Sequence, residues 1–297
     1  MADQAGPLNP ARKSRPVPRR SSRARPDLAT IGGLVLAFGG ILGGLVMEGG
    51  KLKDISQITA AIIVFGGTCG AVMVSTPMNV LIAAAQRLAH VFFDHSETPD
   101  SVIDELIGYA ASARRNGLVA LEDEVMQIQD PFLRKALNLA VDGTDLQEIR
   151  SMMQLEIELV EDQALAEARV FECAGGYSPT IGIIGAVMGL IQVMKNLANI
   201  EDVGHGIAVA FVATVYGVGL ANVVLLPVAT KIKARIESDT ALKELKLEGV
   251  VAIVEGMNPK LIRNKLEAYQ RQTKKAIPAS ARARNQGAVS KPVSAGN

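Results

Sequence analysis

The stretch CAGGYSPTIGIIGAVMGLIQVM, residues 173–194, is the strongest indication of fold in this 297-residue chain. It runs for 22 residues without Asp, Glu, Lys or Arg, and a helix of about 20 apolar residues crosses the hydrocarbon core of a bilayer. Three more stretches, 28–47, 55–86 and 206–230, also lack charged residues. One such stretch could be a buried helix of a soluble protein. Four in one chain predict an all-α polytopic membrane protein with four transmembrane helices and a helical cytoplasmic domain.

Composition excludes several other classes of protein. The chain is 48% hydrophobic with a mean hydropathy of +0.23, which argues against intrinsic disorder. Its two cysteines, Cys69 and Cys173, lie in or beside apolar stretches, without the spacing of a disulfide scaffold or a metal site. No P-loop, dinucleotide-binding glycine motif, nucleophile constellation or zinc motif is present. We therefore predict no enzymatic activity, no metal and no cofactor.

The charged segments predict the orientation of the spans. The net charge of +1 conceals a net charge of +5 in residues 1–27, −11 in 87–172 and +8 in 231–297. The two alternate sides of the membrane hold 28 and 3 Lys and Arg residues, and the positive-inside rule places the richer side in the cytoplasm. Both termini are thus predicted to be cytoplasmic. The opposite charges of the cytoplasmic segments indicate either mutual packing or simply solvated helix faces.

Local signals predict the helices between and after the spans. Asp100 or Ser101 is the expected first cap, and that helix should end at Asn116-Gly117. A second helix is expected over about 118–129, and Asp130-Pro131 should open a third. A long helix from near Asp145 should run into the third span, and the fourth span should continue to about Val254. No β pattern is present.

These segments divide the chain into six parts, with the two ends, rich in polar residues and proline, expected to be disordered. The parts are a basic N-terminal tail (1–27), transmembrane helices 1 and 2 (28–86), an acidic helical cytoplasmic domain (87–172), transmembrane helices 3 and 4 (173–230), a cytoplasmic helical extension (231–275) and a disordered tail (276–297).

Small residues recur at helical spacing in every span. They include glycine pairs in the first span and a small-x3-small pattern in the others, and such patterns let helix backbones approach closely in a membrane. They serve either packing within the chain or self-association. The members are Gly32, Gly33, Gly39, Gly40, Gly43, Gly44, Gly66, Gly70, Gly185, Gly189, Ala213, Gly217 and Ala221.

No ionisable Asp, Glu, Lys or Arg lies within the four stretches. Because an ion relay normally needs such a group at depth, the chain either transports nothing or surrounds a partner that supplies a carboxylate. Pro179 and Pro227 suit hinges, although a membrane helix also tolerates proline. The basic N-terminal tail suits anionic lipid headgroups. Nucleic acid is not expected, because no aromatic residues accompany these charges.

Several motifs together resemble the MotA/PomA family, the larger stator subunit of the bacterial flagellar motor. The resemblance covers about residues 28–270 and is carried by five segments. They are GGYSPTIGIIGAVMGL (175–190), AVAFVATVYG (208–217) followed by Ala221-Asn222 and Pro227, ARRNGLVALE (113–122), DPFL (130–133) continuing to VDG (141–143), and EGMNP (255–259).

The resemblance implies a homopentamer in the bacterial inner membrane around a dimer of a MotB-like subunit, which is single-span and anchored to peptidoglycan. The partner's aspartate would accept the proton, and inward proton flow would produce torque on the rotor. Pro179, Pro227 and Thr214 match positions of coupling and ion flow, with Tyr216 nearby. Arg114 and Glu122, with Arg115 beside them, match the charged residues that engage a FliG-like rotor switch protein.

The chain departs from the family pattern at a few positions. Ala186 stands where sodium-driven relatives tend to have threonine, so the missing hydroxyl favours protons over Na⁺. Ala213 replaces a common threonine, and Gln163-Ala164 replaces an Arg-His pair. Two alternatives remain at this point. One is an ExbB/TolQ-like protein that energises a periplasmic or outer-membrane process, although those relatives have three spans. The other is a membrane-structural protein without conduction.

Overall fold

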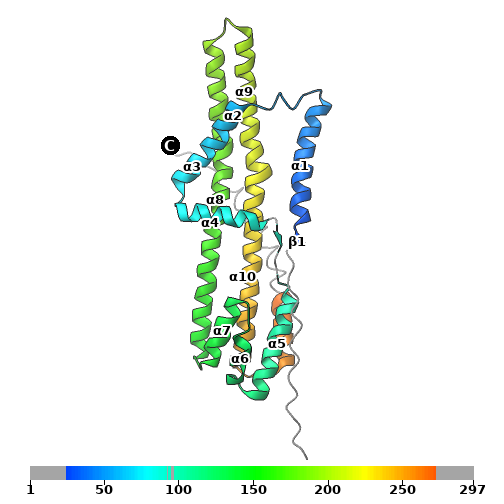
Figure 1. Ribbon diagram of the computed structural model, residues 1–297, viewed down its shortest axis with the longest axis vertical. Helices are drawn as coiled ribbons and strands as arrows, with labels where there is room; N and C mark the ends of the chain where they lie inside the picture. The colour runs from blue at the N-terminus through cyan, green and yellow to red at the C-terminus, as the bar shows by residue number, and fades with distance from the viewer. Residues whose placement is uncertain (1–24, 92, 95–96, 272–297) are drawn as a thin grey trace, which may run out of the picture.

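The computed structural model describes residues 25–91, 93–94 and 97–271, which are mostly helical and form a long column (Figure 1). Four helical stretches are long and apolar enough to cross a membrane, which confirms the four predicted spans and the all-α class. The predicted tails lie largely outside the described residues. The stretches are Leu28–Met47, Ile58–Ser75, Leu146–Lys195 and Ile200–Val254, of which the last two extend well beyond one span.

The first span is helix α1, Leu28–Met47, and its bounds coincide with the charge-free stretch. Asp27 caps it, because its Oδ1 accepts hydrogen bonds from the amides of Ala29 (3.1 Å) and Thr30 (3.2 Å). Just before it, β1 (Arg25–Pro26) pairs antiparallel with β2 (Phe93–Asp94). This two-residue pairing is the only β structure among the described residues, and no β pattern in the sequence predicted it.

The second span combines three helical segments. They are α2 (Ile58–Ala61), the π-helical turn η1 (Ile62–Gly66) and α3 (Gly67–Ser75). After Pro77 the chain turns into α4 (Met78–Val91), which lies across the long axis of the column (Figure 1). The part of the charge-free stretch 55–86 beyond Pro77 therefore leaves the span.

The third and fourth spans form a long hairpin. Helix α8 runs unbroken for 50 residues, Leu146–Lys195. Asp145 caps its start, because the Asp145 carboxylate accepts a hydrogen bond from the backbone amide of Gln147. The second, returning arm of the hairpin consists of three consecutive helical segments. They are α9 (Ile200–Gly219), the π-helical segment η3 (Leu220–Leu225) and α10 (Leu226–Val254). Both predicted continuations out of the membrane are confirmed.

The short helices occupy the end of the column away from the spans. They are α5 (Pro99–Asn116), the 3₁₀ turn η2 (Val119–Leu121), α6 (Glu122–Val125) and α7 (Pro131–Val141). With the start of α8, the end of α10 and a final helical stretch over 259–271, they form a unit that we call the basal domain.

Two local predictions about the basal domain are wrong. Thr98, and not Asp100 or Ser101, caps α5, because Pro99 occupies the first helical position and the cap must precede it. The expected helix over 118–129 is only η2 and α6, one turn each. The end of α5 at Asn116-Gly117 and the start of α7 at Asp130-Pro131 are confirmed.

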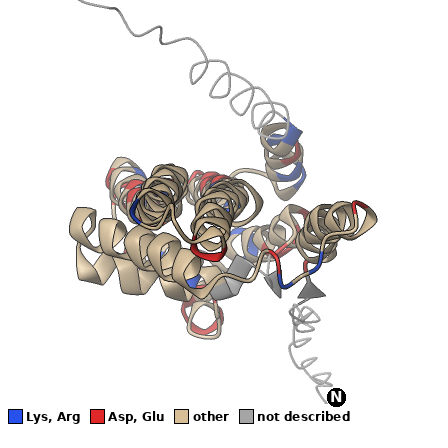
Figure 2. Cartoon of the chain, turned by 90° about the horizontal axis from the view of Figure 1, so that it is seen from above, with Lys and Arg blue, Asp and Glu red and all other residues tan. Residues whose placement is uncertain are grey.

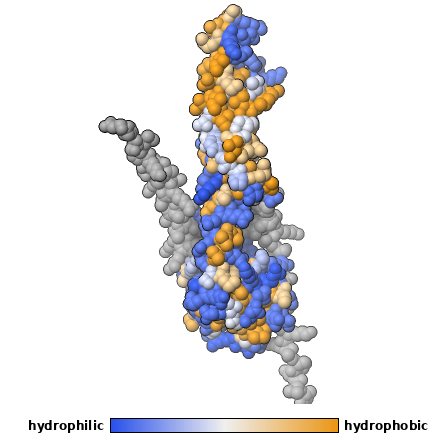
Figure 3. All heavy atoms as spheres, turned by 90° about the vertical axis from the view of Figure 1, so that its left-hand side faces the viewer, coloured by the Kyte–Doolittle hydropathy of each residue, from blue (hydrophilic) through white to orange (hydrophobic). Residues whose placement is uncertain are grey.

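Burial differs between the two ends of the column. The basal domain has a conventional apolar core in which side chains of α5, α7, α8 and α10 interdigitate. The upper column exposes many large apolar side chains instead, and apolar residues cover much of it in Figure 3, whereas the lower part is mainly hydrophilic. The largest fully buried side chains of the basal core are Ile103, Leu106, Leu121, Leu133, Leu137, Ile149, Met153, Ile157, Leu245, Ile262 and Leu266.

Candidate functional site

The α8–α9 hairpin is held together by glycines at backbone contact. A Cβ added to Gly217 would lie 2.7 Å from the carbonyl oxygen of Ser178, and one added to Gly182 would lie 2.9 Å from that of Ala213. Gly189 and Gly206 meet in the same way nearer the hairpin's turn. The small-residue pattern of these two spans is thus used within the chain, which decides between the two interpretations for this pair of helices.

Pro179 lies in this hairpin, one residue after a buried interhelical hydrogen bond. Ser178 is fully buried, and its hydroxyl donates to the carbonyl oxygen of Gly217 over 2.9 Å. Because proline has no amide hydrogen, the carbonyl of Gly175, four residues earlier, lacks its usual partner in the helix. The Ser178 hydrogen bond therefore holds the two helices together, while the missing hydrogen bond at Pro179 weakens α8 at the next residue.

Pro227 lies near the same turn of α8. A Cβ on Gly175 would come within 2.6 Å of a methyl carbon of Leu226, the residue before Pro227. Pro227 follows η3, whose π-helical hydrogen bonding already departs from the regular α-helix. The structure thus brings the helical turn that precedes Pro179 next to Pro227, and both helices are weakened at this level.

The other residues predicted near the ion path make local contacts. The Thr214 hydroxyl donates to the carbonyl of Ala210 on its own helix over 3.2 Å. The Tyr216 hydroxyl donates to the carbonyl of Ile55, and its ring lies 6.2 Å from that of Phe65, so Tyr216 fastens α9 to the second span. Ala186 is half-buried on α8. Within the described residues, no cluster of three or more His, Cys, Asp and Glu side chains could hold a metal ion.

The glycines of the first span, unlike those of the hairpin, do not pack against another helix of the described residues. None of the α1 residues is buried within the chain. A Cβ added to any of its six glycines would meet no atom within 4 Å. A surface this open at backbone level is free for lipid or for another protein.

Ion pairs connect the helices where the spans meet the basal domain. Asp27 binds Lys231 (2.5 Å) and Arg235 (3.5 Å) of α10, so the start of α1 is tethered there. The Lys231 hydrogen bond is the main reason that the pKa of Asp27 falls from 3.8 to about 2. Lys233 pairs with Glu172 at 2.5 Å. Figure 2 marks such basic and acidic residues along the helices.

The predicted rotor-contact residues come together at the tip of the basal domain. Arg114 and Arg115 lie in the last turn of α5, and Glu122 begins α6. The Ser112 hydroxyl donates to Glu124 over 2.8 Å and holds α6 against α5. Arg114, Arg115 and Glu122 are exposed, and none forms an ion pair with another described residue. Their charges are available to a partner.

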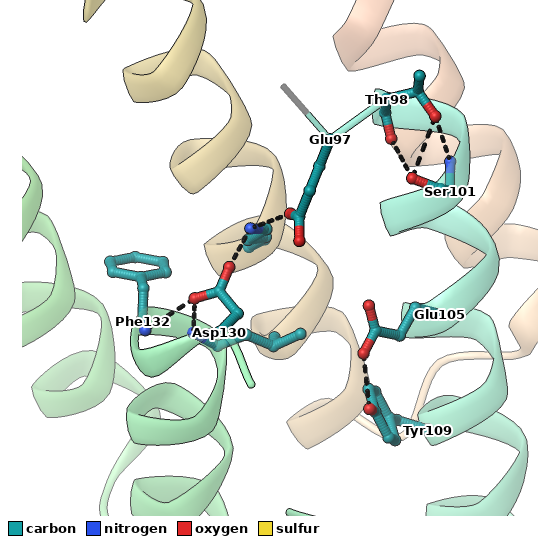
Figure 4. A network of polar contacts seen from close by, with 9 residues as sticks. Glu97, Thr98, Ser101, Glu105, Tyr109, Asp130 and Phe132 are labelled. Carbon is teal, nitrogen blue, oxygen red and sulfur yellow. Dashed lines mark hydrogen bonds and ion pairs between the residues drawn. The ribbon is translucent and has the colours of Figure 1, made fainter. Parts of the chain in front are cut away.

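A buried cation positions α5 and α7 on α10. Lys246 of α10 has a side chain only 6% exposed, and its ammonium group binds Asp130 and, over 2.8 Å, Glu97. Figure 4 shows both carboxylates pointing at this group, while the other oxygen of Asp130 caps α7 at Phe132. Burial opposes both charges, but the pairing prevails: the pKa of Lys246 is raised and that of Asp130 is lowered.

Sequence reasoning did not assign roles to Lys246, Ser178 or Asp27. Lys246 and its partners are 149 and 116 residues apart, so no local pattern reports their contact. Ser178 was noted only as part of the third-span motif. A polar residue directly before a proline, within an uncharged span, was a signal that could have indicated an interhelical hydrogen bond.

Comparison with known proteins identifies the family. Residues 31–115 match the Motility protein A N-terminal family, and residues 124–245 match the MotA/TolQ/ExbB proton channel family. Motility protein A of Bacillus subtilis is 37% identical over 82% of this chain and 90% of its own length. The chain belongs to the MotA/TolQ/ExbB proton channel family.

Its similarity to the motility branch of that family is broad. The chemotaxis protein PomA of Vibrio alginolyticus is 31% identical over 84% of this chain and 98% of its own length. A solved C. jejuni MotAB structure is 34% identical, with a TM-score of 0.78, over 82% of this chain and 95% of its own. The flagellar MotAB stator complex of Bacillus subtilis is 36% identical, with a TM-score of 0.75, over 81% and 94%.

These relatives decide the functional class. The chain is a MotA-type subunit of the flagellar motor stator, a multi-pass protein of the inner membrane and not an enzyme. The ExbB/TolQ-like alternative is not favoured, because the relatives described above are motility proteins and four spans are present. The resemblance inferred from the motifs is confirmed.

Proposed function

We propose that five copies of this MotA-type chain surround a MotB-like dimer and couple inward proton flow to torque on a FliG-like rotor protein. The four spans hold no Asp, Glu, Lys or Arg between their charged ends, so the titrating carboxylate must come from the partner. The solved relatives are complexes of MotA with MotB, which supports this assembly. The open glycine face of α1 and the exposed apolar side chains of the hairpin leave surface for lipid, partner and neighbouring copies.

The observation that carries the coupling is the continuity of two helices. Helix α8 runs from the third span into the basal domain without a break, and η3 and α10 carry the fourth span into it. The prolines at 179 and 227 weaken both at adjoining levels. A conformational change at the ion path therefore moves the basal domain, because the same helices continue into it. Arg114, Arg115 and Glu122 then transmit this movement to the rotor by contact.

The test uses charge reversal at the tip in a host that lacks its own stator. Arg114→Glu, expressed with the MotB-like partner, should reduce swimming severely while membrane levels stay unchanged. A reversed charge on the rotor protein should restore part of the swimming. The matched control is Arg134→Glu, on α7 and outside the tip. Normal swimming of a variant with both Arg114 and Glu122 reversed would show that the contact face is misplaced.

The proton assignment rests on Ala186, which offers no hydroxyl to a sodium ion. Swimming speed should be independent of sodium at constant proton-motive force and should fall with a protonophore. Proton leak through a complex whose partner lacks its plug segment should require Pro179. A speed that follows the sodium gradient would overturn this assignment.

The same proposal places both termini and the basal domain in the cytoplasm. The strong excess of Lys and Arg on that side supports it. Reporter fusions at either end should show cytoplasmic activity. Anionic lipid binding by the basic N-terminal tail stays a prediction, because residues 1–24 lie outside the described residues.

A further inference from the structure

The basal domain has a small hollow beside Arg114. Its volume is about 220 Å³, and it lies between the ends of α5 and α10. Its lining is mostly apolar, with the Arg114 side chain as the charged member. The residues are Ala110, Ala113, Arg114, Gly117, Leu118, Ile253, Val254, Gly256 and Met257. We call it the tip pocket.

The tip pocket exists because two helices end there on glycines. Helix α5 is followed by Gly117 (φ +87°), and α10 is followed two residues on by Gly256 (φ +68°). Both glycines lie in the left-handed region that favours glycine. A Cβ at either position would meet no atom within 4 Å. Two alanines of α5, at 110 and 113, add little bulk to the wall. The hollow is therefore large enough to accept part of a side chain from outside.

The surroundings indicate what would enter the pocket. Val119 and Met126, which follow α5 in the chain, are 69% and 71% exposed. Arg114 is an exposed cation that forms no ion pair with a described residue. An apolar hollow with an unpaired guanidinium on its wall is complementary to a segment that presents an apolar side chain and a carboxylate together.

We propose that the tip pocket receives a large apolar side chain of the rotor protein, from a segment whose neighbouring carboxylate pairs with Arg114. This inference rests on the proposed rotor contact and deepens it. Charge alone gives a weak, exposed pair. An apolar side chain inserted beside that pair would exclude water, strengthen the pairing and fix the register of the contact.

The test fills the pocket without changing any charge. Ala113→Leu extends a half-buried wall residue into the hollow, and Ala111→Leu makes the same change on the same helix outside the lining. The stator complex with its MotB-like partner is purified for each, and binding of the rotor protein is measured. Ala113→Leu should weaken binding on the order of tenfold, whereas Ala111→Leu should bind like the wild type.

A second variant separates the pocket from the charged contact. Arg114→Glu tests the proposed rotor face itself. If Arg114→Glu abolishes binding and Ala113→Leu leaves it unchanged, the tip pocket is empty in the contact and this inference is overturned, while the proposed function stands. If both variants bind the rotor protein normally, the proposed rotor contact is refuted together with the tip-pocket inference.

A double-mutant cycle identifies the occupant. In the rotor protein, each large apolar residue next to a carboxylate is changed to alanine. One such change should weaken binding to the wild type and have little further effect on the Ala113→Leu complex. Equal losses from Ala113→Leu and Ala111→Leu, or additive losses for every rotor change, would overturn the proposal. So would self-association of stator complexes through this pocket in place of rotor binding.

Discussion

The first span and the α8–α9 hairpin both carry glycines, but these glycines have opposite structural roles. In the hairpin, an added Cβ on Gly182, Gly189 or Gly217 would collide with the backbone of the other helix. In α1, an added Cβ on any glycine would point into open space. The hairpin is fastened along its length, whereas α1 is tethered through Asp27 at one end. Small residues therefore mark close approach only where a partner helix is present, and the glycines of α1 meet no such helix among the described residues.

Gly217→Val should disrupt the packed hairpin more than any other change considered below. Its side chain would begin 2.7 Å from the Ser178 carbonyl oxygen and force the hairpin apart, at a cost of about 1–3 kcal/mol. We expect little folded protein in the membrane and no swimming. Gly40→Val in α1 is the matched control and should leave the unfolding temperature of the isolated subunit unchanged. If Gly40→Val instead reduces ring assembly, the open face of α1 contacts a neighbour.

A second prediction concerns the weak point within the fastened hairpin. Pro179→Ala restores an amide hydrogen for the Gly175 carbonyl and regularises α8. We expect swimming to be lost while membrane levels and assembly with the partner remain normal. Pro131→Ala, at the first position of α7, removes no such defect and should swim normally. Full swimming speed of Pro179→Ala would refute the coupling role.

A third prediction tests the tether of α1. Because the pKa of Asp27 is lowered to about 2, its stabilising effect is complete above the ordinary value of 3.8 and is lost as the pH falls towards 2. Asp27→Asn should therefore lower the unfolding temperature of the purified complex at pH 6, and the difference from the wild type should vanish near pH 2. A difference that stays constant over this pH range would exclude the ion pair as its cause.

A fourth prediction, with a smaller change in stability, concerns the hydrogen bond between α9 and the start of the second span. Tyr216→Phe removes the hydroxyl that donates to the Ile55 carbonyl and should cost about 1 kcal/mol. Tyr177→Phe is the control, since the Tyr177 hydroxyl has no hydrogen-bond partner among the described residues. Thermal unfolding of the two purified variants measures the difference. Equal unfolding temperatures would show that the ring of Tyr216, and not its hydroxyl, fastens α9 to the second span.

Much of this architecture was predictable because hydropathy and capping are local properties. The bounds of α1, the unbroken α8 and the Asp130 cap all followed from residues adjacent in the chain. The Thr98 cap was missed although Pro99 signalled it. The short α6 was overpredicted as a full helix, because apolar spacing alone does not reveal where tertiary packing ends a helix.

The parts that sequence could not supply depend on distant contacts. Small residues at helical spacing occur in both, so they did not distinguish the packed hairpin from the open α1. The Lys246 network and the tip pocket each join segments more than 100 residues apart. The residues proposed for ion flow and rotor contact came from the resemblance. The structure adds that Arg114, Arg115 and Glu122 share one end. It also adds that the helical turn before Pro179 packs against Leu226, the residue before Pro227.

The uninterrupted length of α8 makes it a lever arm. Pro179 divides this helix unequally, with 33 of its residues on the basal side, a length of about 50 Å at about 1.5 Å per residue. A bend of about 5° at the proline would carry the far end through about 4 Å, roughly the diameter of a methyl group. An angular change too small to disturb the glycine contacts of the hairpin becomes, at the basal domain, a displacement as large as a side chain.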